Sequence, residues 1–225
     1  ILNALASGKG SRIRDLSEAT GLSMGTVSST VRGLKDLTSP AVSDEGSITA
    51  AGLKLLEPFR VTNAVIMAAG LSSRFAPISY EKPKGLLTVR GEVLVERQIR
   101  QLREAGVSDI YLVLGYKKEE FFYLEDEMGV KIRINDEYLT RNNNSTIKCV
   151  EDVLDNTYIC SSDDYFTINP FETYVYQSYY AGVYAEGLTD EYCFTLVGKE
   201  GRIRSVSVGG RDAWQMMGHV YWDRS

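Results

Sequence analysis

The sequence predicts an α/β protein in which a Rossmann-like domain with a mixed sheet follows a small winged helix-turn-helix domain. Three observations support this fold class. Residues 1–60 show short helical patterns and then a polar turn between two extended pieces. From Val61 onward, short apolar runs alternate with amphipathic segments, which is typical of a doubly wound sheet. Beyond Tyr165 hairpin patterns replace this alternation. We therefore expect domains at residues 1–60 and 61–225.

In the first domain, apolar residues recur at helical spacing. Gly21 is expected to end the second helix, and Ser23 is suited to cap the third. The polar residues 43–47 predict the turn of a wing. The expected elements, in order, are the end of a helix at residues 1–5, a helix at 12–20, a helix from 23, extended pieces at 41–42 and 48–49, and a helix from 49.

Residues 15–28 resemble the helix-turn-helix of MarR-like bacterial regulators, and residues 47–52 resemble their wing exit. The resemblance implies that the third helix can enter a DNA groove. The candidate DNA contacts are Ser23, Thr26, Ser28, Ser29 and Arg32. Asp44 and Glu45 at the wing tip argue against this role, because DNA phosphates repel them. Homodimerisation or docking of a partner stays open as the alternative.

The second domain begins with a strand and a loop of small residues. The apolar run Ala64–Ala68 predicts a buried parallel strand, and Gly70 opens the loop that contains Arg74. Small residues let backbone N–H groups approach an anion closely. Arg74, and Lys84 in the later Lys-Pro-Lys motif at 82–84, would place positive charge around a triphosphate. The pattern therefore predicts a phosphate-binding loop.

Further strands and helices are expected along the second domain. The predicted strands lie at 63–68, 109–114, 131–135 and 157–162, and the predicted helices at 92–105, 117–127 and 144–154. A turn at 198–201 joins strands 193–197 and 203–208, and a final strand covers 214–222. His219 lies in that apolar strand, which indicates a packed core residue rather than a ligand.

Asp163 is the expected magnesium ligand. It follows the strand at 158–162, and open α/β sheets bind ligands at this end of their strands. Mg²⁺ takes one or two carboxylates together with phosphate oxygens and water. Asp164 should point to the opposite side of the chain.

The segment from residue 63 to Lys84 resembles the opening of the nucleotidyltransferase superfamily. The chain from 63 to 223 is similar, more narrowly, to the CTP:phosphocholine cytidylyltransferases of bacteria. The motifs that carry this similarity are residues 68–74, 82–84, 135–138, 142–143, the strand end at Asp163, residues 190–192 and residues 221–223. The expected fold is therefore a nucleotidyltransferase domain.

This resemblance implies a reaction and a set of roles. The expected reaction moves CMP from CTP to a phosphorylated small molecule, with phosphocholine favoured, and it releases pyrophosphate with the help of Mg²⁺. Lys84 would contact the α-phosphate and Arg74 the β- and γ-phosphates, while Asp163 holds the metal. The implied nucleotide-binding residues are Ala68, Ala69, Gly70, Leu71, Ser72, Ser73, Arg74, Lys84, Asn142, Asn143 and Ser145, the last three at the base.

Three features depart from the family pattern. Ser72 occupies a position where many relatives have glycine, and Ser161-Ser162-Asp163 replaces an Asp-x-Asp motif. The sequence ends at Ser225, before the segment in which relatives place a second metal carboxylate, so we expect a truncated catalytic domain. Asn142, Asn143 and Ser145 have a second interpretation, because a polar loop that caps the next helix would show the same residues.

Aromatic residues crowd the second half of the chain and suggest a site for a quaternary ammonium group. Such a group has charge but no N–H donor, and aromatic faces with nearby carboxylates bind it. The candidate acceptor-binding residues are Glu191, Tyr192, Tyr221 and Trp222. Most aromatic residues in such strands belong to the core, so we expect only one or two of them in the site.

Composition narrows the function classes. The chain is 44% hydrophobic and 24% charged with a net charge of −5, which is ordinary for a globular protein and unlike a dedicated nucleic-acid binder. No membrane span or signal-peptide pattern is present, and the three cysteines lack metal-ligand spacing, so we expect reduced thiols, no membrane insertion and a cytoplasmic location. The alternatives are a sugar-phosphate or phosphoethanolamine nucleotidyltransferase, and a nucleotide-sensing DNA-binding regulator.

Overall fold

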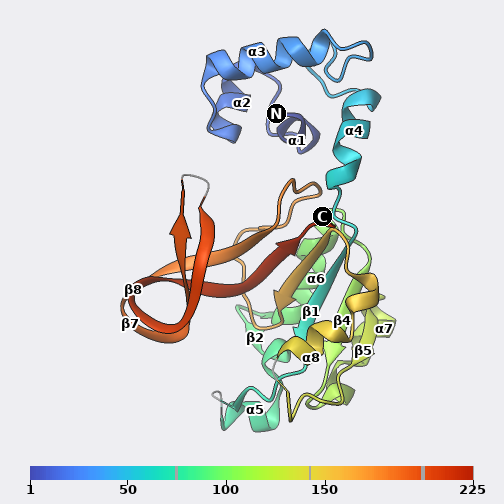
Figure 1. Ribbon diagram of the computed structural model, residues 1–225. Helices are drawn as coiled ribbons and strands as arrows, with labels where there is room; N and C mark the ends of the chain where they lie inside the picture. The colour runs from blue at the N-terminus through green and yellow to red at the C-terminus, as the bar shows by residue number, and fades with distance from the viewer. Residues whose placement is uncertain (74–75, 142, 199–200, 225) are drawn as a thin grey trace. The chain divides into compact units, whose positions relative to one another are not determined.

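The chain divides into two compact units. The computed structural model describes residues 1–73, 76–141, 143–198 and 201–224 (Figure 1). The first unit is Ile1–Arg60 together with Glu172–Tyr176, and the second is Val61–Phe171 together with Gln177–Ser225. The sequence did not indicate that a segment inside the second domain, 172–176, would belong with the first unit.

Short helices form the first unit. They are α1 (Leu2–Ala6), α2 (Ile13–Thr20), α3 (Met24–Lys35), α4 (Ala50–Leu56) and the 3₁₀ turn η1 (Glu57–Phe59). Gly21 ends α2 with a left-handed φ of 69°, and the Ser23 side chain caps α3 by accepting a hydrogen bond from the Thr26 amide at 3.1 Å. Both predictions are confirmed. The expected extended pieces are represented by one bridge between Val42 and Ile48.

A small apolar core holds these helices together. Ala4, Leu16 and Val27 are buried against one another. Near the end of the unit, Gly52 in α4 approaches the backbone at Ala41 so closely that an added Cβ would lie 2.3 Å from its carbonyl oxygen. This contact requires a residue without a side chain, so Gly52 sets how closely α4 packs against the backbone at Ala41.

The return segment 172–176 is bound to the first unit by charged and aromatic contacts. Glu172 accepts hydrogen bonds from the Lys9 ammonium at 2.8 Å and the Asn3 amide at 3.2 Å. Tyr174 forms a backbone bridge with Arg60, whose guanidinium lies 4.9 Å from the centre of the tyrosine ring. The first unit therefore includes a segment that begins nine positions after Asp163.

A mixed sheet forms the centre of the second unit. Within the described residues six strands follow the order β5-β4-β1-β6-β8-β7, in which β5, β4, β1 and β6 are parallel and β8 and β7 antiparallel. The elements are β1 (Asn63–Ala68), α5 (Ile78–Glu81), η3 (Lys84–Leu86), β2 (Thr88–Val89), β3 (Glu92–Val93), α6 (Leu94–Glu104), β4 (Ile110–Leu114), η4 (Lys118–Phe121), α7 (Tyr123–Met128), β5 (Lys131–Ile134), α8 (Asn143–Lys148), η5 (Glu151–Val153), β6 (Thr157–Ser161), β7 (Tyr179–Val197) and β8 (Arg202–Trp222). The α/β class with a mixed sheet is as predicted.

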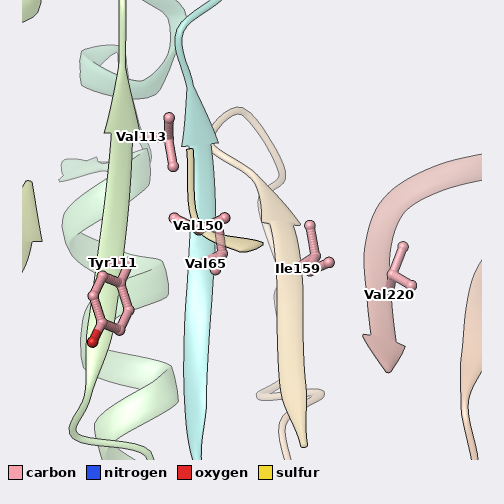
Figure 2. Packing of buried hydrophobic residues seen from close by; sticks show 6 residues of the cluster. All are labelled: Val65, Tyr111, Val113, Val150, Ile159 and Val220. Carbon is pink, nitrogen blue, oxygen red and sulfur yellow. The ribbon is translucent and has the colours of Figure 1, made fainter. Parts of the chain in front are cut away.

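Alternation along the strands builds one core face. Val65, Val113, Ile159 and Val220 come from four neighbouring strands and lie on the same side of the sheet (Figure 2). Val150, which follows α8, packs against this face. Figure 1 shows α8 in front of the strands and α6 behind them. The central strands are therefore covered on both faces, which explains their continuous apolar sequence.

An aromatic cluster surrounds the single histidine. His219 is buried, and its ring centre lies 5.5 Å from that of Tyr158 and 5.2 Å from that of Phe171. Its Nε2 atom lies 2.8 Å from the Tyr179 hydroxyl. Burial lowers the pKa of His219 to about 4, because an apolar environment disfavours the imidazolium. The prediction that His219 is a core residue is confirmed.

The last two strands are longer than the sequence pattern indicates. The predicted strands at 203–208 and 214–222 are parts of one strand, β8, which pairs with β7 through several register shifts. Gly187 and Gly209 both have left-handed φ angles, and Figure 1 shows the far part of this hairpin curling away from the sheet. Glycine and polar residues read as strand breaks, whereas the hairpin accommodates them as bulges.

Among the described residues, no helix has both the length and the apolar character needed to cross a bilayer. The three cysteines are free thiols; Cys160 and Cys193 are buried and Cys149 is half-buried. Burial raises the pKa of the Cys160 thiol, which keeps it protonated.

We expect Gly52→Ala to destabilise the first unit by about 1–3 kcal/mol, because the new methyl group would overlap the Ala41 carbonyl. Gly33→Ala is the matched control. Gly33 lies inside α3 with open space around it, and alanine there should add up to about 1 kcal/mol of stability. Urea unfolding monitored by circular dichroism measures both changes, and equal effects of the two substitutions would contradict the close approach of α4.

Candidate active site

A cavity of about 240 Å³ lies at the carboxyl ends of β1 and β6. The two strands pair in parallel with Met67 opposite Ser161, so the loops that follow them start at one edge of the sheet. Open α/β sheets bind their ligands at this edge. The described residues that line the cavity are Met67, Ala68, Ala69, Gly70, Ser72, Pro83, Lys84, Gly85, Phe121, Thr146, Ser161, Ser162 and Asp163.

The small-residue loop after β1 forms one wall. Gly70 has open space around its Cα, so its backbone can approach a ligand. Ser72 adopts a φ of 54°, which lies in the left-handed region that glycine reaches without steric cost. This geometry explains why glycine suits the position at which this chain has serine.

Part of the predicted phosphate loop lies at the cavity. Of the predicted residues, Ala68, Ala69, Gly70 and Ser72 line it, whereas the exposed residues Leu71 and Ser73 are not part of the lining. Arg74 lies outside the described residues.

Lys84 and Asp163 meet at the cavity, as their predicted roles require. The Lys84 ammonium lies 3.1 Å from the Asp163 carboxylate, although the residues are 79 positions apart in the chain. Their side chains are 20% and 40% exposed. A pair this accessible to water contributes about 1 kcal/mol or less to folding. The effect of the pair is therefore to place a cation and an anion side by side in the cavity.

Close packing behind Asp163 fixes the turn that presents it. The Ser162 amide donates to the Met67 carbonyl at 3.2 Å, which extends the pairing of β1 and β6. A Cβ on Gly85 would lie 2.9 Å from the Ser162 Cβ, so only glycine allows this approach. The sequence motif Lys82-Pro83-Lys84 could have been extended by one residue to include Gly85.

Asp164 lies outside the cavity lining, as predicted. One of its carboxylate oxygens is buried without a hydrogen-bond partner among the described residues. Burial, and secondly the negative charge of Asp163, raise the pKa of Asp164 to about 6. The same carboxylate raises the pKa of Tyr180, whose own burial is the larger cause. The ionised Asp164 carboxylate thus destabilises the folded second unit.

The residues predicted to recognise the base have different positions. Asn142 lies outside the described residues, and for Asn143 only its place at the start of α8 is described. The Ser145 side chain is buried and accepts a hydrogen bond from Asn135 at 3.0 Å. Ser145 is not among the described residues that line the cavity, and its contact with a nucleotide stays a prediction. Thr146, the next residue, lines the cavity.

The predicted acceptor residues do not share one cavity. Tyr221 is fully buried with its ring centre 5.4 Å from that of Tyr158, so its predicted contact with a ligand is wrong. Trp222 points the other way and lines a separate cavity of about 490 Å³ in the second unit. Tyr192 is exposed on β7 beside the half-buried Glu191, and neither is among the described residues that line that cavity.

Asp163 is the residue at the cavity that could hold a divalent metal. Within the described part of the chain, no three histidine, cysteine, aspartate or glutamate side chains cluster as a metal site. A single accessible carboxylate fits Mg²⁺, which completes its shell with phosphate oxygens and water. The arrangement does not suit zinc, which takes three or four protein ligands.

Comparisons with known proteins identify the family of the chain. The model of the MobA-like NTP transferase domain matches residues 64–164. The choline-phosphate cytidylyltransferase of Streptococcus pneumoniae is 35% identical over 160 residues, which cover 71% of this chain and 69% of that protein. The chain belongs to this nucleotidyltransferase family. As a family member, it is an enzyme of the nucleotidyltransferase class with the fold described above.

One further relative and one solved structure support the assignment. The 2-aminoethylphosphonate cytidylyltransferase of Lancefieldella rimae is 39% identical over 165 residues, covering 72% of this chain and 67% of that protein. The solved structure of the CTP:phosphocholine cytidylyltransferase from Streptococcus pneumoniae superposes with a TM-score of 0.69 at 34% identity, covering 73% of this chain and 71% of the other. Each similarity covers about seven-tenths of this chain.

We expect Asp164→Asn to stabilise the metal-free protein at neutral pH. The pKa of this carboxyl group is about 6 in the folded protein, whereas its ordinary value, which applies to the unfolded chain, is 3.8. Between these two pH values the folded state therefore binds more protons than the unfolded state. Stability then falls as the pH rises from 4 to 6, and the full penalty of about 2–3 kcal/mol is present above pH 6.

The measurement compares urea unfolding of both proteins in a chelator at about pH 8 and pH 3.5. The gain should be about 2–3 kcal/mol at the higher pH and vanish at the lower, where the wild-type carboxyl is protonated. His219 titrates in both proteins, so its effect cancels in the difference. A gain that does not change with pH would contradict a buried, ionised Asp164.

Proposed function

We propose that the second unit transfers CMP from CTP to the phosphate of a small cationic acceptor, with phosphocholine as the substrate. The observation that carries this proposal is the Lys84–Asp163 pair at the cavity beside a small-residue loop. The names of two relatives, both cytidylyltransferases, support the choice of nucleotide.

The chemistry needs positioning more than proton transfer. An oxygen of the acceptor phosphate attacks the α-phosphorus of CTP, the bond from that phosphorus to the bridging oxygen breaks, and pyrophosphate leaves. The attacking oxygen is already negatively charged, so no general base is required. Alignment of the two phosphates and neutralisation of their charge lower the barrier. The cavity residues supply both.

In this proposal each cavity residue has one task. The backbone at Gly70 and Ser72 surrounds the triphosphate, and Lys84 places its ammonium at the α-phosphate. Asp163 would hold Mg²⁺, which when bound neutralises negative charge on phosphate oxygens. Arg74 would contact the β- and γ-phosphates of the leaving pyrophosphate.

The base and the acceptor are proposed to bind beside the phosphates. Asn142 comes directly before α8 in the sequence and Asn143 is its first residue, and amides can both donate to and accept from a pyrimidine. Tyr192 offers an exposed aromatic face for the cationic group, and Glu191 supplies a negative charge next to it. The relative from Lancefieldella rimae is named for 2-aminoethylphosphonate, which also has a cationic ammonium group, and this makes it the second candidate acceptor.

Pyrophosphate release tests the proposal directly. The protein is assayed with each of the four NTPs against phosphocholine, phosphoethanolamine, 2-aminoethylphosphonate and glucose 1-phosphate, with Mg²⁺ or with a chelator. We expect turnover with CTP and a cationic acceptor, and none with the Asp163→Asn variant. Preference for another nucleotide, or equal use of glucose 1-phosphate, which has no cationic group, would overturn the substrate assignment.

For the first unit we propose a winged helix-turn-helix that contacts DNA. The observation in favour is that α3 follows α2 after three residues. The helix presents Thr26, Ser29 and Arg32 to solvent, and its cap residue Ser23 is exposed as well. DNA contact would make the chain a nucleotide-sensing regulator as well as an enzyme. The same unit would serve as a homodimerisation module if sedimentation shows a dimer and no DNA is bound.

We expect Lys84→Ala to lower kcat by about 10²–10³ while the Kd for CTP changes far less, because the lysine charge acts on the transition state. Lys82→Ala is the control, since Lys82 is exposed and lies outside the cavity lining. Single-turnover rates and equilibrium binding of CTP separate the two effects. If only the affinity for CTP falls and kcat is unchanged, Lys84 binds CTP in the ground state and does not stabilise the transition state.

We expect Tyr192→Ala to lower kcat/KM for phosphocholine about thirtyfold and to leave CTP binding unchanged, since a desolvated cation–π contact is worth about 2 kcal/mol. Tyr192→Phe should be mild, because the ring face remains. Trp222→Ala is assayed in parallel. Loss of phosphocholine use with Trp222→Ala but not with Tyr192→Ala would move the acceptor site to the 490 Å³ cavity.

We expect the first unit's DNA affinity to fall steeply with salt, and Arg32→Ala to reduce the slope of log K against log[salt] by about one. Arg14→Ala is the control, because Arg14 lies on α2 and pairs with Glu18. Fluorescence anisotropy with a labelled duplex at several salt concentrations measures both slopes. Absence of binding at low salt would leave dimerisation as the role of this unit.

A further inference from the structure

Helix α6 buries a polar side chain on its apolar face. Val95, Ile99 and Leu102 are fully buried there, and Gln98 between them is only 1% exposed. A buried amide costs free energy unless hydrogen bonds compensate it. The hydrogen bonds of the Gln98 amide therefore offset the cost of burying it.

Gln98 holds both ends of the turn that presents Asp163. Its Nε2 atom donates to the Ser161 carbonyl at 2.7 Å and to the Asp164 carbonyl at 2.9 Å. These are the first and last residues of the four-residue turn in which Asp163 is third. The backbone bond that would close this turn, from the Asp164 amide to the Ser161 carbonyl, is long at 3.5 Å. Closure of the turn therefore depends mainly on Gln98.

The donor group of Gln98 is what matters here. Its Oε1 atom is buried and has no hydrogen-bond partner among the described residues, whereas both N–H groups are used. Glutamate has the same length but, when ionised, offers no donor. Asparagine is one methylene shorter. Glutamine alone combines this reach with two donors in one plane.

We propose that Gln98 is a positioning residue that fixes the Asp163 carboxylate for Mg²⁺ by clamping the Ser161–Asp164 turn. The inference rests on the function proposed above. Magnesium demands near-octahedral geometry at about 2.0–2.1 Å, so a small rotation of the turn misplaces the carboxylate. Residues that orient a metal ligand typically affect metal affinity by about 10–100-fold.

Gln101 on the same helix provides a matched control. It is also buried, its Oε1 also lacks a partner among the described residues, and its Nε2 donates to the Phe166 carbonyl at 3.1 Å. That carbonyl lies beyond the turn. Replacing either glutamine by methionine removes the donors with little change in volume. A general loosening of α6 would affect both variants alike.

The test measures Mg²⁺ binding without turnover. Mg²⁺ is titrated by calorimetry into protein saturated with CTP in the absence of acceptor, for wild type, Gln98→Met and Gln101→Met. We expect Gln98→Met to weaken Mg²⁺ binding about 10–100-fold and Gln101→Met to stay within about threefold of wild type. Hydrogen exchange of the metal-free proteins should show faster exchange of the Asp164 amide in Gln98→Met alone.

The outcomes separate this inference from the proposed function. Wild-type affinity in Gln98→Met, or equal losses in both variants, would overturn the role of Gln98 while the transferase proposal survives. No Mg²⁺ binding by the wild-type protein with CTP would overturn the proposed function itself. An unchanged Asp164 exchange rate in Gln98→Met would show that Gln98 does not clamp the turn.

Discussion

The parallel pairing of β1 with β6 is the constraint on which the candidate site depends. It places the loop after β1 and the turn after β6 at one edge of the sheet, with Met67 opposite Ser161. The Ser162 amide extends the pairing by one further hydrogen bond, and Gly85 allows η3 to close against Ser162. Lys84 and Asp163 then meet without contributing much stability themselves. The buried strands and the close backbone contacts hold the two charged side chains in place, so the charges themselves can act on a substrate.

The parallel half of the fold could be predicted because its physical signals are local. β1, β4 and β6 are apolar runs covered on both faces, and the boundary of β1 at 63–68 agrees with the predicted strand. The antiparallel half could not be predicted in the same way. β8 includes the two glycines 209 and 210, which read as a break between strands, but register shifts absorb them into one strand. The packing of residues 172–176 with the first unit could not be predicted from the sequence, because their contact partners lie far away in the chain.

At the site, the charged residues could be predicted from their sequence motifs. Residues whose role depends on whether their side chains are buried could not be predicted in this way. Lys84 and Asp163 were predicted from a motif and a strand end, and they lie together. Tyr221 and Trp222 were predicted alike, yet the twofold period of a strand puts the first in the core and the second on the opposite side. Gln98 carried a detectable signal: a polar residue on the face that Val95, Ile99 and Leu102 define.

Asp163 and Lys84 should separate when metal and nucleotide bind at the cavity. A crystal structure of the protein with CTP and Mg²⁺, in the absence of acceptor, tests this separation. We expect a Mg²⁺ ion about 2.1 Å from an Asp163 oxygen, with the Lys84 ammonium turned to the α-phosphate. A structure in which CTP binds elsewhere, while Lys84 and Asp163 keep their 3.1 Å contact, would contradict it.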